Sequence, residues 1–399
     1  MIETRFKETE VGRIPEDWEV KPLADIGNIS KGAGISRAEA LSGNIPAIRY
    51  GEIYTCHNDY IKSFHSFISQ SVAESSVQIF NGDILFAASG ETKEEIGKSV
   101  AYTENETAYA GGDIIILHSD TEKFDAKFCG YALNAKCVIK QKAQRGQGDA
   151  VVHIVPRDLA TILFAFPTKS EQTRIATALS NIDTLISELG KLIEKKRAIK
   201  QGAMQQLLTG KKRLKGFSEP WVKSLIKDLY HVTRGYVLAM TKIDNHKSAK
   251  YPYPVFSSQT KDNGIAGYYS QYLYENAITW TTDGANAGNV KYRNGKFYCT
   301  NVCGVLLSDN GMANLCMAGI LGLVSKSHVS YIGNPKLMNN TMAEIEIYHP
   351  SDVKEQIAIS DILIKIDDEI TSLEAKKAKY EQIKQGMMQQ LLTGKIRLI

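Results

Sequence analysis

Two long stretches of the chain carry apolar residues at alternating steps of four and three. The stripes consist of Ile175, Leu179, Ile182, Ile186, Leu189 and Ile193, and of Ile359, Leu363, Ile366, Ile370 and Leu373. This spacing follows the heptad rule of supercoiled helices, and neither stretch contains an internal proline. The pattern predicts two helices of about 35 residues that pack on each other. A long helix buried in a globular core is the alternative for each stretch.

The rest of the chain has a different pattern, with short apolar runs bounded by Gly, Asp or Ser. Such runs are typical of buried strands. They lie at 82–87, 114–117, 277–280 and 302–307, and polar, glycine-bearing loops separate them. Loops of this kind on a rigid scaffold are where recognition usually occurs. The fold class expected is therefore α+β, with mixed α/β regions and two long helices.

An internal repeat relates the two halves of the chain. Residues 201–214 recur as 385–398, and all but two of the fourteen pairs are identical at a constant offset of 184. The same offset relates 171–172 to 355–356 and 182–183 to 366–367. A weaker similarity at an offset of about 203 relates Trp18 to Trp221 and Gly32 to Gly235. Two copies of one scaffold thus frame two different inserts.

The repeat sets the expected domain boundaries and symmetry. We expect a first mixed α/β domain at 1–169, a central helix at 170–216, a second mixed α/β domain at 217–353 and a C-terminal helix at 354–399. Because the chain returns to the same motif, the helices should pack antiparallel with pseudo-twofold symmetry. Ile186 and Ile370 should then be buried between them.

Composition limits the class of protein. A chain of 399 residues with 43% hydrophobic residues and no apolar run of membrane-spanning length indicates a soluble protein of several domains. The N-terminus lacks the apolar core of a signal peptide, and six cysteines do not suggest a disulfide framework, so a cytoplasmic location is expected. The net charge of +4 permits nucleic-acid binding but argues against coating DNA by charge alone.

Charge is distributed unequally between the two predicted helices. Residues 169–216 carry 11 basic and 4 acidic side chains, whereas 352–399 carry 8 of each sign. The basic excess centres on 195–197 and 211–213. A solvated helix face is the ordinary interpretation, and contact with DNA or with an acidic partner is the alternative.

Several local patterns imitate catalytic sites. Residues 90–99 end in Gly-Lys-Ser, but six residues separate the two glycines where a phosphate-binding loop has four. Asp83 with Glu91 and Lys93 imitates the carboxylates and lysine of a Mg²⁺-dependent nuclease, a short pattern that the second half lacks. Nucleotide binding and catalysis are therefore disfavoured.

The cysteines and a methyltransferase-like segment also lack residues that the corresponding chemistry requires. Cys299, Cys303 and Cys316 lack a fourth zinc ligand at suitable spacing, so buried thiols are the better interpretation. No loop for S-adenosylmethionine is found, and 334–336, Asn-Pro-Lys, lacks the second proline and the aromatic residue of the adenine methyltransferase motif. We expect no catalytic centre, cofactor or metal ion.

The chain resembles type I restriction-modification specificity subunits along its whole length. The opening 7–18 looks like the start of that family, and 205–211, Gln-Gln-Leu-Leu-Thr-Gly-Lys, looks like the end of its central spacer. Residues 82–99 resemble one class of its target-recognition domains, and 253–260 with 278–285 resemble another. This combination of motifs is highly specific.

The resemblance implies a DNA-binding protein that is not itself an enzyme. Its two target-recognition domains would each read one half of a bipartite double-stranded DNA site, held apart by antiparallel coiled-coil spacer helices. Two methyltransferase subunits would dock on the helices and methylate adenine at N6, and two restriction/translocase subunits would add ATP-dependent cleavage. No membrane partner is implied. A stand-alone Mg²⁺-dependent nuclease and a structural coiled-coil adaptor without DNA contact are the alternatives.

Candidate DNA contacts follow from the side chains that read bases and hold phosphates. Gln, Asn, Arg and Lys distinguish base edges, whereas Ser, Thr and backbone groups mostly hold phosphates. In the first insert the candidates are Ser89, Glu91, Thr92, Lys93, Lys98, Arg145 and Gln147. In the second they are Ser257, Ser258, Gln259, Thr260, Lys261, Thr281, Thr282, Asp283 and Asn286. We expect Gln259 to read bases of one half-site and Lys98 to hold phosphate in every sequence. An ordinary solvated turn is the alternative for each loop.

Overall fold

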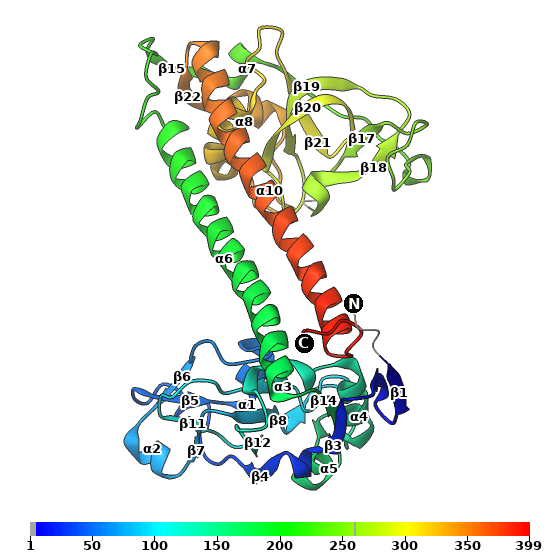
Figure 1. Ribbon diagram of the computed structural model, residues 1–399. Helices are drawn as coiled ribbons and strands as arrows, with labels where there is room; N and C mark the ends of the chain where they lie inside the picture. Colours follow the sequence, from blue (N-terminus) through cyan, green and yellow to red (C-terminus); the bar gives the residue numbers. More distant parts are fainter. Residues whose placement is uncertain (1–4, 259–260) are drawn as a thin grey trace. The chain divides into compact units, whose positions relative to one another are not determined.

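The computed structural model describes residues 5–258 and 261–399, which divide into two compact units (Figure 1). The first unit combines Met1–Leu189 with Lys376–Ile399, and the second is Gly190–Ala375. Each unit therefore contains one insert together with a segment of each long helix.

Two helices of 39 residues form where the heptad stripes lie. They are α6 (Lys169–Leu207) and α10 (Val353–Leu391), whose starts differ by the 184 residues of the sequence repeat. At 1.5 Å per residue each is about 58 Å long. Ile370 is buried and Ile186 is half-buried, so the stripe is more open at Ile186 than expected.

Within each unit the α6 and α10 segments run antiparallel. In the second unit Lys196 pairs with Glu369 at 2.5 Å and Lys200 with Asp367 at 2.5 Å. The residue number on α10 therefore falls as the residue number on α6 rises, as in an antiparallel pair. In the first unit Lys384 near the end of α10 pairs with Asp183 at 2.8 Å. These contacts also show that acidic residues of α10 neutralise part of the basic run of α6.

The first unit is built around a four-stranded antiparallel sheet. Its strands, in spatial order, are β10 (Ser99–Ala101), β8 (Asp83–Ala87), β12 (Ile114–Ser119) and β4 (Gly27–Lys31). All five residues of β8 are buried because successive side chains enter two different cores: Ile84 and Phe86 lie in one and Leu85 and Ala87 in the other. This explains the continuous apolar run.

A second sheet and several short elements complete the first unit. The sheet is ordered β6 (Ser66–Ile68), β5 (Ile45–Ile48), β11 (Ala108–Ala110) and β7 (Val77–Ile79). Paired short strands are β1 (Phe6–Thr9) with β2 (Gly12–Pro15), β3 (Glu19–Pro22) with β14 (Leu163–Phe166), and β9 (Ser89–Gly90) with β13 (Val152–His153). The helices are α1 (Tyr50–Thr55), α2 (Gln70–Glu74), α3 (Ala126–Ala132), α4 (Lys136–Arg145), α5 (Pro156–Ala160) and the 3₁₀ turn η1 (Leu23–Asp25).

The second unit repeats this topology without repeating the sequence. Its six-stranded sheet is ordered β16 (His231–Arg234), β21 (Cys303–Leu307), β19 (Tyr274–Thr281), β20 (Val290–Cys299), β17 (Tyr253–Phe256) and β18 (Ile265–Tyr269). The antiparallel order β20-β19-β21-β16 matches β10-β8-β12-β4 of the first unit. The pair β15 (Trp221–Leu225) and β22 (Glu346–Pro350) matches β3 and β14. The helical elements are α7 (Ile226–Leu229), α8 (Leu315–Val324), α9 (Asn339–Ala343), η2 (Met240–Lys242), η3 (Lys261–Gly264) and η4 (Ser325–His328).

Repeated polar residues anchor the long helices in the same way in both units. The amide of Gln172 donates to the carbonyl of Pro167 at 2.9 Å, and that of Gln356 donates to the carbonyl of Pro350 at 2.8 Å. Both side chains are buried. Since buried polar groups need such partners, these bonds fix where each helix begins. The identical residues of the sequence repeat are thus mainly structural.

Candidate nucleic-acid interface

In the first unit a tight hairpin lies beside the predicted loop 89–93. Gln147 and His153 exchange both backbone hydrogen bonds, at 2.9 and 2.7 Å, leaving the five-residue tip 148–152. Gly148 has φ +109°, and a Cβ there would lie 2.2 Å from the Val151 carbonyl oxygen. This turn therefore requires glycine.

The structure brings together the two loop segments predicted in the first insert. Strand β9 pairs with β13, and the Ser89 hydroxyl is hydrogen-bonded to His153 Nδ1 at 2.9 Å. Ser89 is buried by this contact, whereas the next three candidates are exposed. The three exposed residues, Glu91, Thr92 and Lys93, share a cavity of about 240 Å³ with the hairpin tip. Loop 89–93 and the hairpin thus form one surface.

The side chains of Arg145 and Gln147 are partly engaged within the unit. Arg145 donates through Nε to the Thr161 hydroxyl at 2.8 Å and through a terminal nitrogen to the Gln141 carbonyl at 3.1 Å. Gln147 is exposed and donates to Asp158 at 3.2 Å. Arg145 therefore shapes the base of the hairpin, and Gln147 is the more accessible of the two.

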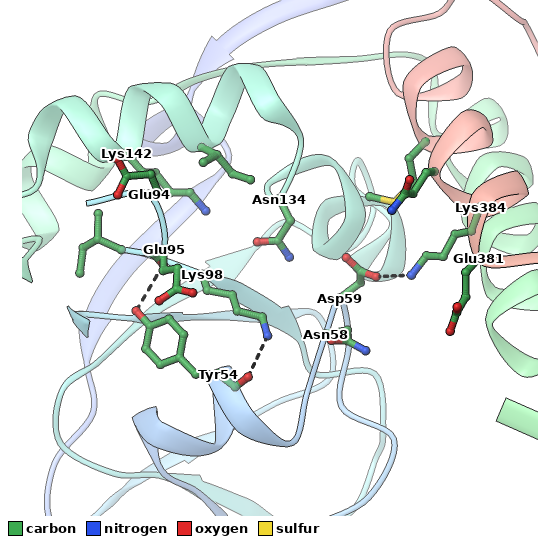
Figure 2. A pocket seen from close by; sticks show the side chains of 14 residues that line it. Tyr54, Asn58, Asp59, Glu94, Glu95, Lys98, Asn134, Lys142, Glu381 and Lys384 are labelled. Carbon is green, nitrogen blue, oxygen red and sulfur yellow. Dashed lines mark hydrogen bonds and ion pairs between the residues drawn. The ribbon is translucent and has the colours of Figure 1, made fainter. Parts of the chain in front are cut away.

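Lys98 does not have the exposed ammonium that the sequence led us to expect. Figure 2 shows it beside Tyr54 in a pocket of the first unit. Its Nζ donates to the carbonyls of Tyr54 at 3.3 Å and His57 at 2.7 Å. Burial lowers the pKa of this half-buried lysine. Because these carbonyls at the end of α1 already hold the ammonium, Lys98 stabilises the fold, and the expected phosphate contact needs correction.

A second lysine of this pocket is completely buried. Lys142 lines the pocket in Figure 2. Its Nζ donates to the carbonyls of Gly97 at 2.6 Å and Leu133 at 2.9 Å. Burial lowers the pKa of Lys142 to about 7. Lys142 thus holds the Gly97 carbonyl and Lys98 holds carbonyls at the end of α1, so both ammonium groups have partners within the unit.

The predicted loops of the second insert also lie together. The amide of Asn286 donates to the Ser258 carbonyl at 3.2 Å, and the Thr300 hydroxyl donates to Ser257 at 3.1 Å. Gln259 and Thr260 lie outside the described residues. Of Lys261, which begins η3, only the backbone is described.

The loop that follows β19 is joined to a hairpin that the sequence did not reveal. Ser330 and Lys336 exchange backbone hydrogen bonds at 2.8 and 2.9 Å, leaving the five-residue tip 331–335. The backbone N–H of Gly284 donates to the Pro335 carbonyl at 2.9 Å. Thr281 and Thr282 are buried, and the Thr282 hydroxyl donates to Asp283 at 2.8 Å. The two threonines therefore support the loop rather than project from it.

The two hairpins occupy equivalent places in the repeat. Gln147 and His153 precede Ser330 and Lys336 by 183 residues each. The residue after each hairpin makes the same bond to the end of the central strand: Ile154 N–H to the Ala88 carbonyl, and Leu337 N–H to the Thr282 carbonyl, both at 2.9 Å. The tips themselves differ, Gly-Asp-Ala-Val-Val against Tyr-Ile-Gly-Asn-Pro. Extending the repeat offset inward from the helices would have found the second hairpin.

The nuclease-like pattern is separated in the structure. Asp83 opens β8 and Glu91 follows its other end, so the two carboxylates do not converge. The Asp83 carboxylate is hydrogen-bonded to His118 Nδ1 at 2.9 Å and accepts from the Phe80 N–H at 2.8 Å. The other ring nitrogen of His118 is 2.8 Å from the Ser30 hydroxyl, and these three side chains link β8, β12 and β4.

The cysteines of the second unit do not form a ligand set. Cys299 and Cys303 lie in one apolar core and Cys316 in another. Burial raises the pKa of Cys316 to about 12. Over residues 5–258 and 261–399, no group of three or more His, Cys, Asp and Glu side chains is arranged to hold a metal ion.

Comparisons with known proteins identify the family of the chain. A profile described as the type I restriction modification DNA specificity domain matches residues 15–201 and 218–385. The chain belongs to this family, as its sequence motifs predicted, and its two matched regions correspond to the two copies of the repeat. The prediction of a specificity subunit rather than a catalytic one is confirmed by this family and by the names of its relatives.

Individual relatives resemble the whole chain or its parts. A protein of Methanocaldococcus jannaschii named as the MjaX specificity subunit is 26% identical over 421 residues, covering 99% of this chain and 97% of that one. A Mycoplasma pneumoniae protein named as the N-terminus of a type I specificity subunit is 41% identical over 137 residues, covering 33% of this chain and 72% of that one. The crystal structure of an S subunit from M. genitalium shares the fold, with TM-score 0.64 and 16% identity over 94% of this chain and 96% of that one.

Within the described part of the chain, no helix combines the length and the apolar character needed to cross a membrane.

Proposed function

We propose that the chain selects a bipartite double-stranded DNA site for a type I restriction-modification complex. Residues 1–169 and 217–353 would be the two target-recognition domains, each reading one half-site. Residues 170–216 and 354–399 would supply the coiled-coil spacer helices between them. Partner subunits would methylate adenine at N6 and carry out ATP-dependent cleavage.

The observation that carries this proposal is the pair of equivalent hairpin-and-loop surfaces. Both are attached at the same point of the same four-strand framework, yet their tips share no residue type at matching positions. A repeated framework with different contact loops can present two similar surfaces to two half-sites of different sequence, as dimeric DNA readers present identical ones. Polar side chains at the edges of these surfaces, such as Gln147 and Asn334, can reach base edges.

The long helices offer a surface for methyltransferase subunits. Leu185, Leu192 and Ile199 remain exposed and lie seven residues apart on one face of α6. Ile383 on α10 is exposed as well and is related to Ile199 by the repeat offset of 184. Exposed apolar residues in a row favour protein contact. Because the surface is partly repeated, two methyltransferase subunits could bind, joined in the intact system by two restriction/translocase subunits.

Mapping methylated adenines tests the proposal. The genome of the native strain should carry N6-methyladenine at one bipartite motif, and deletion of this gene should remove methylation from that motif only. The isolated chain should methylate nothing, and the chain mixed with its methyltransferase subunits should restore the same motif in vitro. Methylation that is unchanged by the deletion would refute the proposed function.

A further inference from the structure

The tip of the second hairpin exposes two neighbouring apolar side chains. Ile332 is 93% exposed and Tyr331 is 69% exposed. An isoleucine loses about 1.5–3 kcal/mol of transfer free energy by remaining in water instead of being buried. Two such residues side by side at the end of a turn indicate a surface that is covered when the protein acts.

The hairpin holds these side chains on a firm base. Ser330 and Lys336 are joined by two backbone hydrogen bonds, and Leu337, directly after the hairpin, is buried and bonded to Thr282. Gly333 at the tip has φ +75°, a conformation that glycine permits. The two apolar side chains thus project from an anchored turn and not from a loose chain end.

Charge around the hairpin favours a polyanionic partner. The segment 325–337 contains Lys326, His328 and Lys336 and no acidic residue. All three basic side chains are exposed. An apolar tip in a segment with three exposed basic side chains, and with Asp283 opposite Lys336 in a backbone bridge, suits DNA. The phosphates attract the cations while the base stack accepts apolar side chains.

We propose that Tyr331 and Ile332 form an apolar wedge that inserts beside a base step in the half-site read by the second unit. This inference rests on the proposed function and specifies how one half-site is contacted. Small apolar side chains that enter the stack unstack and kink the duplex. Recognition would then include the ease with which that step deforms, in addition to hydrogen bonds with base edges.

The first hairpin supplies a matched control. Its tip has the same length and attachment, but its exposed apolar residue is Val151 at 51%, and the acidic Asp149 lies beside it. Asp149 would be repelled by phosphates, so we expect no comparable insertion in the other half-site. The variants Ile332→Ser and Val151→Ser therefore change equivalent tips that differ in chemistry.

The test uses the full chain bound to its methyltransferase subunits and duplexes in which 2-aminopurine replaces one adenine at a time. The adenines that become methylated are left unaltered, because a methyltransferase takes its target base out of the stack. With the unaltered chain, fluorescence should rise at one step of one half-site because the base unstacks. Ile332→Ser should abolish that rise and weaken binding to the site by about ten-fold. Val151→Ser should leave that rise unchanged. Since Ile332 is almost fully exposed, its replacement leaves the core intact.

Three outcomes would contradict the proposal of an apolar wedge. One is the absence of any fluorescence rise with the unaltered complex although it methylates the site. Another is an unchanged rise with Ile332→Ser. The third is loss of a methyltransferase subunit from the Ile332→Ser complex while DNA binding persists, because the tip would then be a protein contact. If the unaltered complex neither binds nor methylates the site, the proposed function fails as well.

Discussion

One ion pair of the sequence repeat occurs twice, in two different environments. Lys384 and Asp183 in the first unit are related by the offset of 184 to Lys200 and Asp367 in the second. The side chains of the first pair are 16% and 11% exposed, and those of the second are 32% and 45% exposed. Identical residues therefore make the same contact at different depths.

The first pair is deeper because neighbouring parts of the first unit join it. Lys384 also contacts the Asp59 carboxylate at 2.8 Å, and the Tyr131 hydroxyl donates to Asp183 at 2.6 Å. Burial raises the pKa of Asp59. Burial alone would lower the pKa of Lys384, but its two carboxylates outweigh burial and raise it. The repeat thus specifies which residues meet, while the insert determines what the contact contributes.

The largest expected effect comes from breaking the deeper ion pair. Lys384→Met leaves Asp59 and Asp183 buried without their cation and should lower the free energy of unfolding of the first unit by about 4 kcal/mol. Lys200→Met should cost the second unit less than about 1 kcal/mol, because that pair is solvated. Native-state hydrogen exchange of β8 and β19 amides would report on each unit separately. Equal losses of unfolding free energy in the two units would contradict the expected difference between the buried and the solvated ion pair.

The next prediction concerns two arginines, each bound to a glutamate in the first turn of a long helix. Arg397 binds Glu171 through two bonds of 2.8 Å and also binds Asp17, whereas Arg213 binds Glu355 through bonds of 2.6 and 2.7 Å. Each replacement by alanine leaves a buried glutamate without its cationic partner. We expect about 3 kcal/mol of destabilisation from Arg397→Ala and about 2 kcal/mol from Arg213→Ala in chemical denaturation. A larger loss of unfolding free energy from Arg213→Ala than from Arg397→Ala would contradict this prediction.

Lys142 should make the stability of the first unit depend on pH. Its pKa is about 7 in the folded chain and about 10.4 when unfolded, so the unfolded state binds more protons between these values. Stability should therefore rise with pH from 7 toward 10, by up to about 1.4 kcal/mol per pH unit from this residue. Lys142→Met should flatten the rise. Denaturation at pH 7, 8 and 9 compares the slopes, and identical slopes would contradict this assignment.

The smallest expected effect distinguishes two lysines of the first insert. The exposed Lys93 should contribute one phosphate contact, so Lys93→Ala should reduce the slope of log affinity against log salt by about 0.9. Lys98→Ala should leave that slope unchanged because its ammonium is held by the carbonyls of Tyr54 and His57. Titrations with DNA at several salt concentrations would separate them. A reduced slope for Lys98→Ala would restore the sequence-based expectation.

The sequence predicted the framework better than the contact surface. Heptad spacing locates both long helices, since a stripe of apolar residues on one helix face favours packing on a partner. The residue types could not reveal whether Lys98 faces solvent or carbonyls, because that depends on where α1 ends. The hairpin 330–336 was not predicted, because Asn334-Pro335 indicates a turn without defining the segments that pair beside it. Its attachment to residues 282–284 depends on hydrogen bonds between segments about 50 residues apart, which the repeat offset indicates and no local pattern encodes.

The most direct test of the account measures each surface against each half-site. Complexes carrying Gln147→Ala in the first hairpin or Asn334→Ala in the second would be titrated with the native site and with sites scrambled in one half. We predict that each variant loses about ten-fold discrimination at one half-site and none at the other, and that the two variants affect opposite halves. Equal loss for all sequences, or loss at the same half-site from both variants, would contradict the assignment of one half-site to each unit.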